Sequence, residues 1–138
     1  MKVLYTADAT ASGEGRDGHA RTSDGILDVD LAMPAELGGK GEATNPEQLF
    51  AAGYSACFHS ALKRVARQLE VDTGGSTVRA RVGLGMIDSG AFGLEVKLDV
   101  HLPNADPAAA ERAVARAHEV CPYSNATRGN IEVALTVV

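Results

Sequence analysis

Residues 45–70 are patterned as one long helix, and any fold of this chain has to accommodate it. Asn45 is a good N-cap, Pro46 suits the first helical position, and Glu47 places negative charge at the positive end of the helix dipole. No further proline interrupts the segment, and its second half has amphipathic spacing with cations near the end. The first half is apolar on almost every side and contains small residues such as Gly53. We therefore predict a central helix that is closely surrounded by other elements.

Strand patterns lie on both sides of this helix. Before it, three β-patterned runs joined by turns predict a small antiparallel meander, with residues 2–12, 19–23 and 26–31 as its strands. After it, we predict a hairpin of residues 77–88 and 93–102, a helix at 108–120, a short helical turn or loop at 121–128, and a closing strand at 130–138. This order indicates an α+β fold rather than a parallel βαβ sheet.

Composition limits both the size of the fold and its partners. The 138 residues are 45% apolar, which suits a single domain over residues 1–138 that needs neither disulfides nor metal. The net charge is −5, and no Lys/Arg run is present, so we expect neither nucleic acid nor an anionic membrane as a partner. Residues 1–8 turn polar too quickly for a signal peptide, and no stretch has membrane-spanning length. We expect a cytoplasmic protein.

The two cysteines each occupy a marked position. Cys57 lies inside the long helix, and Cys121 directly precedes the helix-starting Pro122, where unpaired N–H groups and the helix dipole favour a thiolate. In a reducing cytosol, a bond between these cysteines would be transient and catalytic rather than structural. A second thiol within reach is also what a peroxidatic cysteine needs to trap its sulfenic acid. The sequence leaves open that both cysteines are inert core residues.

A glycine loop precedes the first hairpin and contains one arginine. Residues 13–18 satisfy the G-x-G-x-x-G pattern, but the following residues are β-patterned, whereas a dinucleotide site needs a helix opening at the glycines. Arg16 in this loop is either a solvated side chain or a guanidinium that a flexible loop delivers to a buried thiolate. Glu47 likewise has two possible roles: it interacts with the helix dipole, or its carboxylate orients a cation such as Arg16.

The four histidines, His19, His59, His101 and His118, show no metal-ligand spacing. His118 precedes Cys121 by three residues, but we expect it to face solvent.

Two motifs give the chain a family resemblance: the run from Thr44 to Phe58, TNPEQLFAAGYSACF, and the run CPYS that begins at Cys121. Together with GRDG at 15–18, SDG at 23–25, LAMP at 31–34 and the Gly38-Gly39 pair, they resemble the organic hydroperoxide resistance proteins of the Ohr/OsmC family. The resemblance covers essentially the whole chain and favours the Ohr branch over the osmotically induced branch.

This resemblance implies a fold and a chemistry. The implied fold is an intertwined homodimer in which antiparallel sheets wrap around long central helices. The implied activity is a thiol peroxidase for organic and fatty-acid hydroperoxides, with Cys57 as the peroxidatic and Cys121 as the resolving cysteine. Arg16 falls at the position of the arginine that stabilises the thiolate, and Glu47 at that of the carboxylate that orients it. No bound cofactor is implied, and the reductant is a dihydrolipoyl group carried on a lipoylated protein.

Two other functions compete with this one. The first is a non-catalytic α+β module that binds a small ligand and whose cysteines only pack. The second is a general disulfide oxidoreductase, which is disfavoured because the cysteines are far apart in sequence rather than in a C-x-x-C motif.

Overall fold

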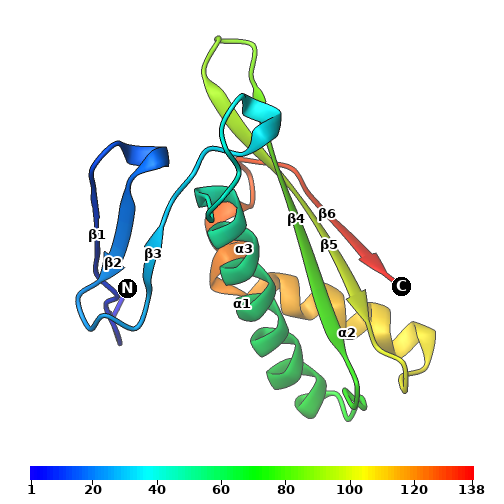
Figure 1. Ribbon diagram of the computed structural model, residues 1–138. Helices are drawn as coiled ribbons and strands as arrows, with labels where there is room; N and C mark the ends of the chain where they lie inside the picture. The colour runs from blue at the N-terminus through cyan, green and yellow to red at the C-terminus, as the bar shows by residue number, and fades with distance from the viewer. The chain divides into compact units, whose positions relative to one another are not determined.

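A computed structural model describes all 138 residues of the chain (Figure 1). The chain forms two compact units, residues 1–49 and residues 50–138, and each is described by itself. The expectation of a single domain stays a prediction.

The first unit is a three-stranded antiparallel meander, as predicted. Its strands are β1 (Ala9–Ser12), β2 (His19–Thr22) and β3 (Asp28–Asp30), in the order β1-β2-β3, with one-turn 3₁₀ helices η1 (Gly15–Asp17) and η2 (Ala35–Leu37) in its loops. β1 is shorter than predicted, because residues 2–8 have no strand partner. Glycine is required at position 18, where a Cβ would lie 2.1 Å from the carbonyl oxygen of Ser12. The glycine loop contains η1, leads into β2 and opens no α-helix.

The long helix α1 (Pro46–Gln68) begins where the sequence predicts. The Asn45 side chain accepts a hydrogen bond from the backbone N–H of Gln48, which satisfies one of the free donors of the first turn. No helix of the protein combines the length and apolar character needed to cross a membrane.

The second unit places helices on one face of a three-stranded sheet. Its remaining elements are β4 (Thr77–Met86), β5 (Phe92–His101), α2 (Pro107–Val120), α3 (Pro122–Thr127) and β6 (Val133–Val137). β4 and β5 form the predicted hairpin, but β6 pairs with β5 in parallel, so the expectation of purely antiparallel sheets is wrong for this sheet. The physical reason is the connection: α2 and α3 carry the chain back along the sheet, so β6 starts at the same end as β5.

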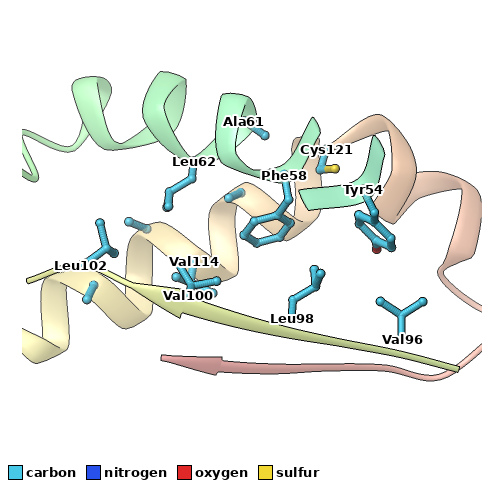
Figure 2. Close-up of a cluster of buried hydrophobic side chains, with 13 residues drawn as sticks. Tyr54, Phe58, Ala61, Leu62, Val96, Leu98, Val100, Leu102, Val114 and Cys121 are labelled. Carbon is cyan, nitrogen blue, oxygen red and sulfur yellow. The ribbon is translucent and has the colours of Figure 1, made fainter. Parts of the chain in front are cut away.

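The core lies between α1, α2 and the inner face of β5 (Figure 2). On α1 the fully buried Tyr54, Phe58 and Leu62 recur every four residues, which places them on one face of the helix. On β5 the buried Val96, Leu98 and Val100 alternate with more exposed residues, as expected for a sheet with one packed face. The α+β class predicted from the sequence is therefore confirmed.

We predict that Leu98→Ala lowers the free energy of unfolding by about 2–5 kcal/mol, because it removes a fully buried side chain and leaves a cavity. Lys97→Ala on the opposite face of the same strand is the control and should change stability by less than about 0.5 kcal/mol. Urea unfolding followed by circular dichroism measures both. Equal effects of the two substitutions would contradict the placement of Leu98 in the core.

Candidate active site

The structure brings the two cysteines together. Cys57 lies on α1 and is half-buried, whereas Cys121 is fully buried and occupies the N-cap position of α3. Both are free thiols, and their sulfur atoms are 3.7 Å apart. A disulfide bond is about 2.05 Å long, so a local movement of one or both side chains would be enough to form it.

The surroundings of Cys57 within the second unit disfavour its thiolate. Burial raises the pKa of the Cys57 thiol, because the charged form is poorly solvated there, and the neighbouring Cys121 thiol raises it further. The backbone N–H of Tyr123 opposes this by hydrogen bonding to the sulfur. Within the second unit, burial therefore works against a reactive thiolate at Cys57.

Three aromatic rings pack beside the thiol pair. Phe50, Tyr54 and Tyr123 form a cluster with ring centroids 5.5–5.9 Å apart, within the range of favourable aromatic contacts. Gly53 makes room for this cluster, because a Cβ at position 53 would lie only 2.8 Å from the hydroxyl oxygen of Tyr123. The small residue that the sequence placed inside a crowded helix thus admits the ring next to Cys121.

Phe50 and Tyr123 also line an apolar groove of about 490 Å³. Its other lining residues come from β5 and from the segment around α3, and include Phe92, Leu94 and Ile131. Neither sulfur atom lines the groove. Its walls share residues with the aromatic cluster, so an apolar molecule in the groove would lie against the same rings that pack beside the thiols.

Within the first unit, Arg16 and Glu47 form a two-point ion pair. The two terminal nitrogens of Arg16 donate to the two carboxylate oxygens of Glu47 at 2.8 and 2.7 Å. The hydrogen bond from Arg16 holds the pKa of Glu47 below its usual range, and Glu47 raises the pKa of Arg16. Glu47 therefore orients a guanidinium in the glycine loop as well as lying in the first turn of α1, ten residues before Cys57.

The expectation that His118 faces solvent is wrong. Its side chain is half-buried, and Nδ1 is 2.9 Å from the hydroxyl oxygen of Ser124. Burial and the nearby Arg128 lower its pKa. The other histidines also have local partners: Asp28 and Asp30 for His19, Ser76 for His59, and the carbonyl of Val138 for His101. No group of three or more His, Cys, Asp or Glu side chains is arranged to hold a metal ion.

Sequence reasoning missed a buried set of hydroxyl groups next to the cysteines. The hydroxyl of Tyr54 is 3.0 Å from the hydroxyls of both Ser124 and Thr127, and all three residues are buried. The available signal was spacing: Tyr54 precedes Cys57 by three residues, and Ser124 follows Cys121 by three. Side chains three residues apart on a helix lie on the same side of it, so each of these hydroxyl groups is expected on the side of its helix that carries the thiol.

The fold and the site together define an α+β protein with two adjacent free thiols, one within its long helix and one at the cap of a short helix. Residues 39–136 match the family described as OsmC-like protein. Over 138 residues the chain is 54% identical to the organic hydroperoxide resistance protein of Xanthomonas axonopodis pv. citri, a match that covers 99% of this chain and 96% of that protein.

Solved structures agree with this assignment. The structure of an organic hydroperoxide resistance protein from Elizabethkingia anophelis matches with a TM-score of 0.94 and 53% identity, and one from Legionella pneumophila with 0.93 and 52%. Each comparison covers 99% of this chain and 98% of the other. The chain belongs to the OsmC-like protein family, and the resemblance to its organic hydroperoxide resistance branch is confirmed.

We predict that Glu47→Gln weakens the fold only where Glu47 is ionised. Because the pKa of Glu47 is lowered in the folded protein, its ion pair stabilises the protein above the unfolded pKa of about 4.3, and this contribution is lost as the pH falls through the folded pKa. Arg16 is partly solvated, so the difference at pH 7 should be only about 0.2–1 kcal/mol.

Urea unfolding of parent and variant between pH 7 and pH 3 measures this difference. Glu42→Gln, at an exposed position, is the control and should change stability at pH 7 by less than about 0.5 kcal/mol. A stability difference for Glu47→Gln that stays constant down to pH 3 would contradict the ion pair.

Proposed function

We propose that this protein is a thiol peroxidase that reduces organic hydroperoxides, including those of fatty acids, and so contributes to organic hydroperoxide resistance. The observation that carries the proposal is the 3.7 Å separation of two free thiols from distant parts of the chain, beside an apolar groove. Inert core cysteines have no need of such an arrangement. The names of the relatives from Xanthomonas axonopodis and Elizabethkingia anophelis support the substrate class.

In the first step, the Cys57 thiolate attacks the terminal oxygen of the hydroperoxide. The O–O bond breaks, its electron pair leaves with the alkoxide, and the alkoxide takes a proton to become the alcohol. Sulfur is oxidised to the sulfenic acid of Cys57, and the hydroperoxide is reduced. The apolar groove lined by Phe50 and Tyr123 supports a substrate with a hydrocarbon tail, because burying such a tail is favourable.

In the second step, Cys121 attacks the sulfenic sulfur, forming the Cys57–Cys121 disulfide and releasing water. An external dithiol then reduces the disulfide by exchange and becomes a disulfide itself. We propose that this dithiol is a dihydrolipoyl group on a lipoylated protein. We further propose that the protein works as a homodimer, which the exposure of large apolar side chains such as Met86 and Phe92 supports.

Arg16 has the role of lowering the barrier to the first step. Burial disfavours the Cys57 thiolate, and positive charge near the sulfur would offset this cost. Arg16 stays protonated at any physiological pH, and its pairing with Glu47 holds the guanidinium in one orientation. We propose that Arg16 stabilises the thiolate and that Glu47 positions Arg16.

The two thiols are predicted to disappear together when the reduced protein receives one equivalent of tert-butyl hydroperoxide. Intact mass should fall by two hydrogens in the parent, remain unchanged in Cys57→Ser, and show a sulfenic acid in Cys121→Ser. Thiol titration and mass spectrometry follow the reaction. Slow and unselective oxidation of all three proteins would rule out the peroxidase and favour a binding module.

Arg16→Ala is predicted to slow sulfenic acid formation by about 100-fold or more, which is typical of removing one group that stabilises charge in a transition state. Arg21→Ala is the matched control, since Arg21 lies on β2 of the same unit and pairs with Asp28. Stopped-flow measurement with limiting protein gives the second-order rate constants. Arg16→Ala reacting as fast as Arg21→Ala would show that the assigned role of Arg16 is wrong.

A further inference from the structure

We propose that the buried hydroxyl of Tyr54 is a positioning group that holds α3 against α1, so that Cys121 meets the sulfenic acid of Cys57. The inference rests on the proposed peroxidase function and assigns a role to a residue that takes no part in bond making. It concerns the second step, disulfide formation, and leaves the first step to Cys57 and Arg16.

The position of Cys121 depends on a helix that has little stability of its own. α3 contains six residues, Pro122–Thr127, and a helix this short is not stable without tertiary contacts. Cys121 is its N-cap residue, so any tilt or shift of α3 displaces the Cys121 sulfur relative to α1. Cys121 is also the C-cap residue of α2, where its backbone N–H donates to the carbonyl of Ala117 at 2.9 Å. The contacts that join α3 to α1 therefore act together with α2 in setting how far apart the two sulfur atoms lie.

Tyr54 supplies the hydrogen bonds between these two helices. Its hydroxyl lies 3.0 Å from the Ser124 hydroxyl and 3.0 Å from the Thr127 hydroxyl, while its ring packs 5.5 Å from that of Tyr123. Tyr54 precedes Cys57 by three residues and shares its side of α1, and Ser124 follows Cys121 by three residues on α3. The hydroxyl contact and the thiol contact thus join the same two helices, one turn apart. Figure 2 shows Tyr54 and Cys121 as neighbours at this end of the core.

A further hydrogen bond extends this hydroxyl network to α2. His118 Nδ1 lies 2.9 Å from the Ser124 hydroxyl oxygen, so Ser124 joins α2 and α1 through one side chain. Ser124 has no exposed surface, and no buried side-chain nitrogen or oxygen lacks a hydrogen-bond partner. A fully satisfied buried network of this kind has one favoured geometry, because any shift leaves a polar group unpaired at low dielectric.

Accurate positioning matters because the sulfur atoms have to approach from 3.7 Å to about 2.05 Å. A reaction between two held groups is fast only when they lie close to the attack geometry, and a misplacement of about 1 Å can cost about 100-fold in rate. A slow second step also has a chemical cost: a further hydroperoxide molecule oxidises the waiting sulfenic acid to sulfinic acid and is itself reduced to the alcohol. Tyr54 would thereby protect Cys57 from irreversible loss.

Tyr54→Phe tests the inference with little other disturbance. The variant retains the buried ring. Ser124 retains its hydrogen bond with His118, and the Thr127 hydroxyl still donates to the carbonyl oxygens of Tyr123 and Ser124. No buried polar group is therefore left unsatisfied. Ser55→Ala is the matched control, because it removes a hydroxyl from the next position of α1 that bonds only to the carbonyl of Ala52 in the same helix.

The experiment measures the two steps separately. Reduced full-length protein receives one equivalent of tert-butyl hydroperoxide, with dimedone present to trap sulfenic acid, and intact mass gives the proportions of disulfide and adduct over time. We expect parent, Ser55→Ala and Tyr54→Phe to form sulfenic acid at the same rate. We expect disulfide formation in Tyr54→Phe to be slower by about tenfold, with more dimedone adduct and more sulfinic acid under excess hydroperoxide.

The outcomes separate this inference from the proposed function. Sulfenic acid that forms at the parent rate but condenses slowly in Tyr54→Phe supports the positioning role, since a residue important only for stability would leave this ratio unchanged. Condensation at the parent rate overturns the inference and leaves the peroxidase intact. Absence of sulfenic acid in the parent itself overturns the peroxidase. Should Tyr54→Phe fail to fold, Ser124→Ala is measured in its place, and the same two rates decide.

Discussion

Burial of one face of α1 against β5 and α2 determines the geometry of the rest of the second unit. Tyr54, Phe58 and Leu62 recur every four residues on that face and have no exposed surface, so they set the rotation of the helix about its axis. Cys57 lies beside this apolar stripe and is half-buried for that reason. A different rotation would expose the apolar stripe to water, so Cys57 is held on the side of α1 where Cys121 lies.

The same burial creates the chemical problem that the site has to solve. Close packing holds two sulfur atoms at 3.7 Å, but it also removes the water that would stabilise a thiolate, and the pKa of Cys57 rises. Position and reactivity therefore have to come from different groups. In our proposal, Tyr54 and its hydroxyl partners supply position, while Arg16, held by Glu47, supplies charge.

Much of the secondary structure could be predicted from local signals, and the predictions that were wrong share a cause. The start of α1 was readable because its cap, proline and acidic residue act within one turn, and the hairpins were readable from alternation and turn residues. The parallel pairing of β6 was not, because strand direction depends on where α2 and α3 return the chain. His118 was misplaced for a similar reason: its partner is on the following helix, and helix periodicity does not show whether that helix folds back over it.

The sequence by itself determined the elements, the polar and apolar faces, and the residue types able to carry redox chemistry, because these follow from interactions between near neighbours. The cysteine motifs also identified the family, which the comparisons confirm. Only the tertiary structure decided that Cys57 and Cys121 lie within reach, that Arg16 pairs with Glu47, and that Tyr54 meets Ser124. Each of these contacts joins residues at least 31 positions apart, and such distances are set by how whole elements pack rather than by any local pattern.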